Sequence, residues 1–180
     1  NMPTRNLVGF VHNSRLPDAA DLVSSLVRYL GLEGRSWSSA ATEIGRVQDN
    51  LVDTSLVVVV GGDGTILRTV RVIAPYSIPI VGVNMGRVGF MTELGEHEAI
   101  EKLEMYVDGV LRVEKRMMLE ASVGSESEES PRLTVHALND VVVGRGETAR
   151  LLDIDTSVDR VALTSYRADA VIVATATGST

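Results

Sequence analysis

Four consecutive valines run directly into a glycine turn in the stretch Ser55–Val70, which reads SLVVVVGGDGTILRTV. Valine is β-branched and favours strands. An unbroken apolar run indicates a strand buried on both faces, and such strands are typical of parallel sheets covered by helices. The stretch therefore predicts an α/β architecture around it, with the carboxylate of Asp63 just beyond the end of a buried strand.

The residues on either side of this strand continue the alternation. Apolar runs predict strands over residues 7–12 and 78–83, with a weaker strand within 31–37. Apolar residues at helical spacing predict helices over residues 18–30, 42–52, 65–74 and 96–110. Strands that alternate with helices in this way predict a parallel sheet with helices on both faces, which we assign to an N-terminal domain of residues 1–110.

From residue 111 onward the pattern predicts strands only. They cover residues 113–123, 133–143, 150–158, 161–166 and 170–174, with a tight turn at Asp159 and Arg160 and a polar hairpin loop at SESEESP. We expect residues 111–180 to form an all-β, sandwich-like domain. The last strand runs into ATGST, where a helix commonly begins, so we also expect this second domain to be truncated.

Composition narrows the classes of partner and compartment. The chain has no cysteine, a formal net charge of -7 and a pI near 5.0. These values exclude disulfides and thiolate metal sites and argue against nucleic acid or anionic membranes as partners. No apolar stretch is long enough to span a bilayer. The three histidines, His12, His97 and His136, have no spacing suited to a metal site. We expect a cytoplasmic protein with small-molecule partners.

The glycine turn after the valine strand favours phosphate binding. In α/β sheets ligands bind beyond the carboxyl ends of the strands, and glycines allow backbone N–H groups to approach phosphate oxygens at a helix N-terminus. Gly61, Gly62 and Gly64 surround Asp63, but the turn is neither G-x-x-x-x-G-K-[ST] nor G-x-G-x-x-G. A simple phosphate site gains nothing from a carboxylate, so Asp63 would hold Mg²⁺ or accept the proton of an attacking hydroxyl. The alternative is that Asp63 only caps the following helix.

A second glycine segment, NMGRVGF at Asn84–Phe90, follows the next predicted strand. Gly86 and Gly89 flank Arg87, which places a guanidinium and flexible backbone at the same edge of the sheet as Asp63. The simpler interpretation is an ordinary connection in which Asn84 forms a local turn.

Two polar stretches stand out in the β-rich part of the chain. LNDVVV at Leu138–Val143 places Asn139 and Asp140 before a strand, where they would bind hydroxyls or an amide edge of a ligand, or simply form a turn. YRADAVIVATATGST at Tyr166–Thr180 has a carboxylate before its strand and a hydroxyl-rich turn after it.

Taken in order, GGDGT, NMGRVGF, the Asn139–Asp140 pair and the YRADAVIVATATGST run resemble the motifs of the NAD kinase family, and the resemblance extends from residue 7 to residue 180. It implies an N-terminal α/β domain that binds the phosphoryl donor and a C-terminal β-sandwich-like domain that binds NAD. It also implies transfer of a phosphoryl group from ATP, or from polyphosphate in some members, to the 2′-hydroxyl of the adenosine ribose of NAD, giving NADP.

The resemblance also implies roles for individual residues. Asp63 would be the general base or the carboxylate that orients Mg²⁺, with Gly61, Gly62, Gly64 and Thr65 around it. Arg68, on the same helix, would contact phosphate, and Asn139 and Asp140 would bind the adenosine of NAD. Further contacts with NAD are implied for Arg150, Arg167, Asp169, Thr177, Ser179 and Thr180. Members of the family are homo-oligomers, so we expect a dimer or tetramer of the full-length protein.

Two positions depart from the family pattern. Ala170 replaces the glycine of the family's D-G pair, and Ala176 replaces the proline of its T-P-T-G-S-T run. The added methyl group of Ala170 would strain a turn that needs positive φ. Two other functions stay open. One is a lipid or sugar kinase, since such enzymes share the G-G-D-G motif. The other is a regulatory protein that binds NAD without catalysis, which the two departures and the expected truncation favour.

Overall fold

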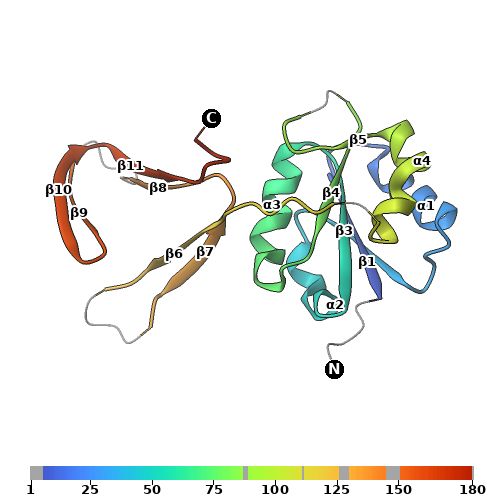
Figure 1. The fold of residues 1–180 in the computed structure, drawn as a ribbon, viewed down its shortest axis with the longest axis horizontal. Helices are drawn as coiled ribbons and strands as arrows, with labels where there is room; N and C mark the ends of the chain where they lie inside the picture. Colours follow the sequence, from blue (N-terminus) through green and yellow to red (C-terminus); the bar gives the residue numbers. More distant parts are fainter. Residues whose placement is uncertain (1–5, 87–88, 111, 126–129, 145–150, 180) are drawn as a thin grey trace. The chain divides into compact units, whose positions relative to one another are not determined.

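The computed structural model describes residues 6–86, 89–110, 112–125, 130–144 and 151–179, and it divides into two compact units, Asn1–Lys115 and Arg116–Thr180 (Figure 1). The elements of the first unit follow in chain order: β1 (Leu7–His12), α1 (Ala19–Tyr29), β2 (Ser36–Ala40), η1 (Ile44–Val47), α2 (Gln48–Leu51), β3 (Thr54–Val60), α3 (Asp63–Ile73), η2 (Ala74–Tyr76), β4 (Ile80–Asn84), β5 (Leu94–Gly95) and α4 (Glu96–Val107).

The first unit is built on a parallel sheet with the strand order β2-β1-β3-β4-β5. The predicted α/β class is confirmed. The strand that contains the four valines, β3, pairs with β1 on one side and with β4 on the other, and all four valines are fully buried. The chain places β2 on one side of β1 and then crosses to place β3 on the other side. Open α/β sheets bind ligands at such a switch point in the strand order.

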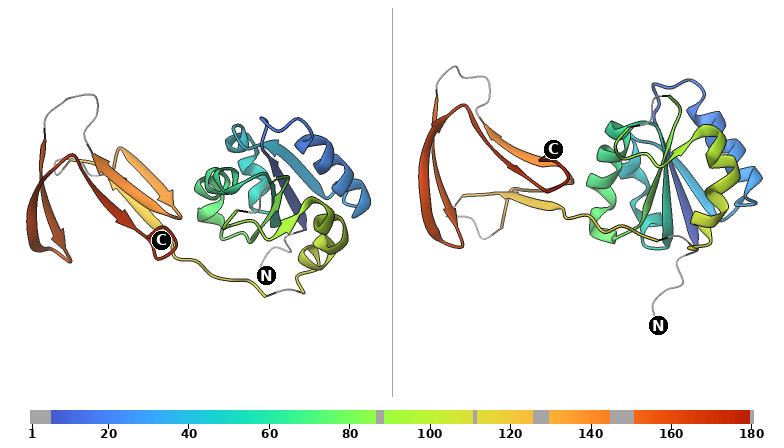
Figure 2. Two further views of the ribbon diagram at one scale, coloured as in Figure 1. Left: turned by 90° about the horizontal axis from the view of Figure 1, so that it is seen from above. Right: turned by 45° about the horizontal axis from the view of Figure 1, so that its top comes forward.

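Helices cover both faces of this sheet (Figures 1 and 2). Alternate strand residues such as Phe10 and Val58 form one core with α1 and α4. On the opposite face, Ile66 of α3 packs on Gly82 of β4. A Cβ added at position 82 would lie 2.8 Å from Cδ1 of Ile66. The two-sided burial explains why the valine run is continuous rather than alternating.

The edge strand β2 is attached to the sheet by Trp37. Its ring lies on Gly9 of β1 so closely that a Cβ at position 9 would come within 2.7 Å of three ring atoms. Its Nε1 group donates a hydrogen bond of 2.9 Å to Oγ1 of Thr54, which is fully buried at the start of β3. One side chain therefore links three neighbouring strands.

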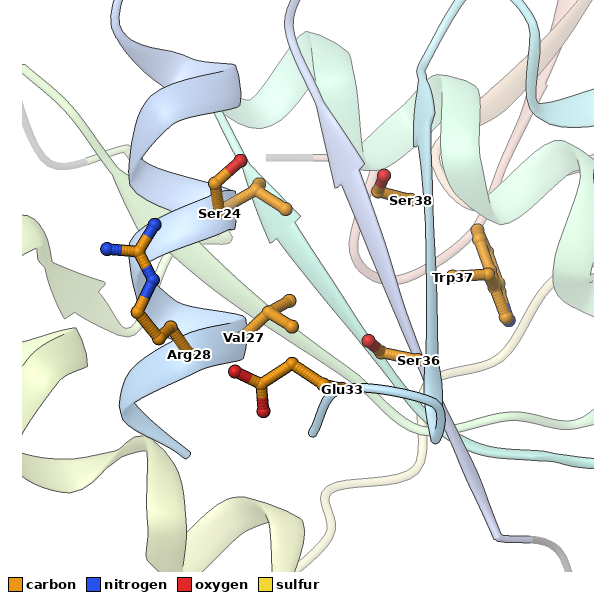
Figure 3. A pocket seen from close by; sticks show the side chains of 8 residues that line it. Ser24, Val27, Arg28, Glu33, Ser36, Trp37 and Ser38 are labelled. Carbon is orange, nitrogen blue, oxygen red and sulfur yellow. The ribbon is translucent and has the colours of Figure 1, made fainter. Parts of the chain in front are cut away.

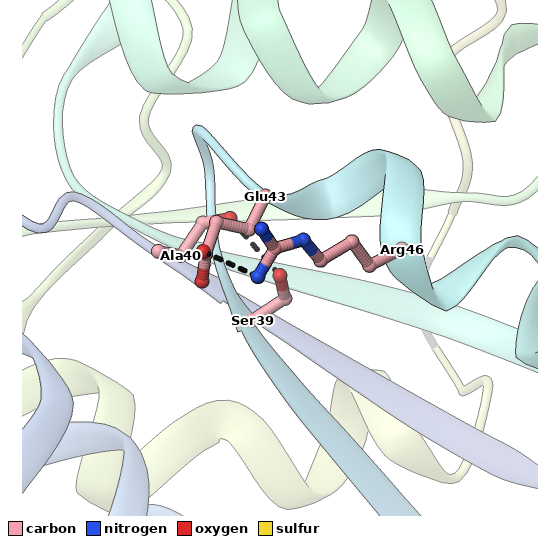
Figure 4. Close-up of polar contacts among 4 residues, drawn as sticks. All are labelled: Ser39, Ala40, Glu43 and Arg46. Carbon is pink, nitrogen blue, oxygen red and sulfur yellow. Dashed lines mark hydrogen bonds and ion pairs between the residues drawn. The ribbon is translucent and has the colours of Figure 1, made fainter.

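Several predicted boundaries in the first unit are wrong by a few residues. The weak strand expected within 31–37 is β2 at Ser36–Ala40, and the helix expected over 42–52 is divided into η1 and α2. After β2, exposed Arg46 and Glu43 pair at 2.8 Å beside Ser39 and Ala40, so these charges satisfy one another (Figure 4). The two-residue strand β5 was not predicted.

The second unit consists of antiparallel strands: β6 (Leu119–Val123), β7 (Leu133–Ala137), β8 (Asp140–Gly144), β9 (Leu152–Val158), β10 (Val161–Ala168) and β11 (Ala170–Ala174). They pair as β6–β7, β8–β11 and β9–β10. The all-β prediction is confirmed, as is the tight turn between β9 and β10, where Asp159 and Arg160 have φ angles of 51° and 68°.

Two strand predictions in this unit need correction. The strand expected over 133–143 is two strands, because the chain turns at Leu138 and Asn139 between β7 and β8. The strand expected over 113–123 is confined to β6. Most of the predicted SESEESP loop lies outside the described residues. Among the helices of the described chain, none combines the length and the apolar character that crossing a membrane requires.

Candidate functional site

The turn from β3 into α3 is held by tight packing around one of its three glycines. Gly61 donates its N–H to the carbonyl of Val83 at 2.9 Å, which joins the turn to the end of β4. A Cβ at position 61 would lie 2.5 Å from Oγ1 of Thr65, so no larger residue fits without movement. The same addition at Gly62 or Gly64 would meet none of the described residues within 4 Å. Only Gly61 is therefore required by packing.

Asp63 is the first residue of α3, yet its side chain does not cap that helix. The N-cap residue is Gly62, and the described part of the chain shows no side-chain cap hydrogen bond at this helix. The carboxylate instead reaches the segment after β4: Oδ2 accepts the N–H of Phe90 at 3.0 Å, and Oδ1 accepts the N–H of Met91 at 3.1 Å. The structure thus does not support the alternative in which Asp63 serves only as a helix cap.

Gly89 makes this approach possible. A Cβ at position 89 would lie 2.3 Å from Oδ1 and 2.7 Å from Oδ2 of Asp63. The two glycine segments identified in the sequence are therefore in direct contact, at the carboxyl ends of the neighbouring strands β3 and β4. Arg87, which we also placed at this edge, lies outside the described residues.

Thr92 anchors the second segment, and the sequence analysis missed it. Its hydroxyl is buried, accepts the N–H of Gly89 at 3.1 Å and lies 3.4 Å from Nδ2 of Asn84. Asn84 also forms the predicted local turn, since its Oδ1 accepts the N–H of Gly86 at 2.8 Å. A lone threonine in a loop carries no sequence signal for this role.

Arg68 is exposed on α3, five positions after Asp63. The described residues show no ion pair with it, so its charge is available to an anion. His12, expected to be structural or solvated, ends β1 beside Val60 of β3, and its Nδ1 atom is buried without a partner in the described part of the chain.

The second cluster of predicted residues lies in the other unit, between β7 and β8 and after β11. Pairing of β8 with β11 aligns Asp140 with Ala174 and so brings Asn139 to Thr175. Thr175 is 2% exposed; its N–H donates to the carbonyl of Asn139, and its hydroxyl lies 2.6 Å from the carbonyl of Leu138. Two stretches more than thirty residues apart are therefore joined by one threonine.

The amide oxygen of Asn139 is the unusual atom in this cluster. Within the described residues, its Oδ1 atom is buried and accepts no hydrogen bond. Buried polar atoms are nearly always paired, so this oxygen can still accept a hydrogen bond. Gly178 lies on the same turn, because its N–H donates to Oγ1 of Thr175 at 3.1 Å.

The remaining predicted residues are spread along the second unit. Arg167 is exposed on β10 opposite Asp153 of β9, and Asp169 is exposed between β10 and β11. Thr177 is half-buried and Ser179 exposed in the turn after β11. Arg150 and Thr180 lie outside the described residues. Ala170 starts β11 opposite Gly144 and is not among the residues with positive φ, so its methyl group causes no backbone strain there.

In the described part of the chain, the predicted site residues belong to no metal-binding cluster, and they do not line the pocket between α1 and β2. Among the described residues, no group of three His, Cys, Asp or Glu side chains could hold a metal ion. A pocket of about 330 Å³ lies between α1 and β2, where Arg28, Glu33 and three serines border it (Figure 3). It contains none of the residues singled out in the sequence.

Known proteins resemble this chain over most of its length. Residues 35–111 match the family of the ATP-NAD kinase N-terminal domain. A protein named NAD kinase from Dehalococcoides mccartyi is 39% identical over 96% of this chain, and one from Heliobacterium modesticaldum is 37% identical over 99%. The chain spans 61% and 64% of the lengths of these two relatives.

Among solved structures, that of yeast NADH kinase complexed with NADH superimposes with a TM-score of 0.80. The alignment covers 97% of this chain and 59% of the yeast chain, at 23% sequence identity. At this identity the likeness shows that the two chains share a fold.

Proposed function

We propose that the chain is a member of the NAD kinase family and that the full-length protein transfers the γ-phosphoryl group of ATP, or a phosphoryl group of polyphosphate, to the 2′-hydroxyl of the adenosine ribose of NAD. One observation carries the proposal. The Asp63 carboxylate stands in a glycine turn at the carboxyl edge of the sheet, held by two backbone N–H groups rather than used as a helix cap.

Asp63 would act on the attacking hydroxyl. An ionised carboxylate has about four lone-pair sites, and the N–H groups of Phe90 and Met91 occupy two of them. The others can accept the proton of a ribose hydroxyl or orient a metal. Phosphoryl transfer needs mostly positioning and charge stabilisation, and one fixed carboxylate can position the attacking hydroxyl.

Mg²⁺ fits the chemistry of this site in a limited way. Magnesium is commonly bound by one or two carboxylates together with substrate phosphates, rather than by an all-protein cage. Asp63 supplies one such carboxylate, and the described residues offer no three-ligand cluster. When bound, the ion would neutralise developing charge on the phosphates.

The donor phosphates would lie at the start of α3. Gly62 and Gly64 leave open space where side chains would otherwise project, which allows phosphate oxygens to approach the backbone. The N-terminus of the helix favours anions, and Arg68 adds an exposed positive charge on the same helix.

The NAD-binding role belongs to the second unit in this proposal. The unpaired Oδ1 atom of Asn139 would accept a hydrogen bond from a hydroxyl or amine of the adenosine, beside Asp140. The other proposed contacts rest on the family resemblance alone: Arg150, Arg167, Asp169, Thr177, Ser179 and Thr180. A cytoplasmic location and a homo-oligomeric assembly are part of the same proposal.

A coupled assay tests the function. The full-length protein is incubated with Mg²⁺, NAD and either ATP or polyphosphate, and NADP is measured with an NADP-specific dehydrogenase. We expect NADP with at least one donor. NAD binding without NADP would favour the regulatory alternative, whereas no NAD binding would favour another substrate, such as a lipid or sugar.

A further inference from the structure

We propose that Gly89–Met91 is a positioning segment for the Asp63 carboxylate and that Gly89 is glycine because any side chain there would displace this carboxylate. The proposal rests on the proposed function, since it assigns a reason for holding Asp63 in place. Both carboxylate oxygens accept a backbone N–H from the segment, at 3.0 Å from Phe90 and 3.1 Å from Met91. Two bonds from consecutive residues fix the rotation of the carboxylate as well as its position.

Side-chain packing of Phe90 does not explain the conformation of the segment. The Phe90 side chain is 99% exposed. The segment is held instead by Thr92, whose buried hydroxyl accepts the N–H of Gly89, and by the two bonds to Asp63. Thr92 connects the segment to Asn84 at the end of β4, and the two N–H groups connect it to the Asp63 carboxylate.

The contact also leaves the carboxylate usable. Backbone N–H groups are donors only, so they cannot take the proton that Asp63 would receive from a hydroxyl, and the unused lone pairs stay accessible. A displaced carboxylate would still be chemically competent but wrongly placed. A misplacement of about 1 Å can cost about 100-fold in rate. Gly89 therefore acts through Asp63 and is a positioning residue.

A double-mutant cycle on thermal unfolding of the full-length protein tests the contact itself. The variants are G89A, D63A and D63A/G89A. A Cβ at position 89 would lie 2.3 Å from the carboxylate, so we expect G89A to lower Tm by several degrees when Asp63 is present and by much less in the D63A background. An equal loss in both backgrounds would overturn the proposal, because the methyl group would then be meeting something else.

Gly86 supplies the matched control for this cycle. It lies in the same loop, but among the described residues an added Cβ would have Asn84 Oδ1 as its nearest neighbour, at 3.8 Å, which is an ordinary contact. We expect any Tm shift of G86A to be small and the same with and without Asp63.

Steady-state kinetics then test what the contact is for. In G89A we expect kcat for NADP formation to fall about 100-fold while KM for NAD changes less than about threefold, because the carboxylate is displaced and the NAD contacts are not. A folded G89A protein with unchanged kcat would overturn the positioning role. If the wild-type protein forms no NADP, the proposed function fails, and the unfolding cycle still decides whether the contact exists.

Discussion

Gly178 lies directly on the backbone of Asn139, so that a Cβ at position 178 would stand 2.2 Å from the Asn139 carbonyl oxygen. The glycine and the asparagine are 39 positions apart in the chain, and pairing of β8 with β11 brings them together. The two polar stretches that we identified in the second unit therefore form one structure.

The variant G178A should separate these two stretches. The methyl group would push the turn after β11 away from Asn139, and we expect the Kd for NAD, measured by calorimetry on the full-length protein, to rise at least about 10-fold, the equivalent of one lost charged or well-placed hydrogen bond. The control is G45A, whose added Cβ meets no atom of the described residues within 4 Å. If G178A bound NAD as tightly as the wild type, Asn139 would not belong to the NAD site.

Thr175 should contribute to stability through its hydroxyl. T175V leaves the carbonyl of Leu138 without the hydroxyl that donates to it and removes one of the two acceptors of the Gly178 N–H, and a buried group left unpaired costs about 1–3 kcal/mol. T175S keeps the hydroxyl and should lose much less. Urea unfolding of both variants measures the difference, and equal losses would mean that the methyl group, not the hydroxyl, holds the turn.

Replacing Asp63 by asparagine should abolish turnover with little effect on NAD binding. D63N keeps the shape of the side chain but cannot act as a base, and its Nδ2 group cannot accept the backbone N–H that one carboxylate oxygen now accepts. The loss of a general base alone typically costs about 10²–10⁴-fold in kcat. Asp53 is the matched control, because it is exposed and directly precedes the first residue of β3, at the end of the strand away from Asp63. D53N should keep full activity. Full activity of D63N would contradict the role assigned to Asp63.

Arg68 and Arg71 are exposed on the same helix and allow a comparison of two charges. If Arg68 contacts the donor phosphates, R68A should raise KM for ATP about 10-fold through loss of a charged hydrogen bond, whereas R71A should change it little. Equal effects of the two variants would indicate a general electrostatic attraction rather than a specific contact.

Acidification should weaken the start of α4. The Lys102 ammonium donates a hydrogen bond to Glu98, as does the N–H of Gly95, and together they hold the pKa of the Glu98 carboxyl below its ordinary value of 4.5. A lowered pKa in the folded state stabilises above the unfolded value, and this contribution is lost as the pH falls through the folded pKa.

The variant E98Q should therefore differ from the wild type mainly above about pH 4.5, and the two Tm curves should converge in more acidic solution. The effect should be small, because both partners are about half exposed. E101Q, on the same helix, is the control. Parallel Tm curves for E98Q and the wild type would show that the pair has no pH-dependent effect.

Much of the fold was predictable because burial determines where apolar residues occur in the sequence. The valine run of β3 could only belong to a strand covered on both faces, and the glycine turn had to follow it. The division between β7 and β8 was missed as a strand boundary because apolar residues resume directly after Asn139 and Asp140, although these two residues were considered as a possible turn. The two-residue strand β5 is too short to leave a pattern.

The site was predictable as a set of residues but not as a set of contacts. Sequence reasoning treats the glycines of the turn alike, yet Gly61 is required by Thr65 while Gly62 and Gly64 have open space. Likewise, nothing in the amino-acid sequence indicates that the Asp63 carboxylate accepts a hydrogen bond from the backbone N–H of Phe90. Such requirements depend on which atoms meet across neighbouring strands, and only coordinates contain that information.

Trp37, which packs on Gly9, is a built-in fluorescent probe. It is the single tryptophan of these 180 residues, and it lies in the first unit, buried and hydrogen-bonded to Thr54. Its fluorescence would therefore follow the loosening of the α/β unit and would not respond directly to the β-rich unit. Compared with far-ultraviolet circular dichroism, which records both, it would separate the unfolding of one unit from that of the other.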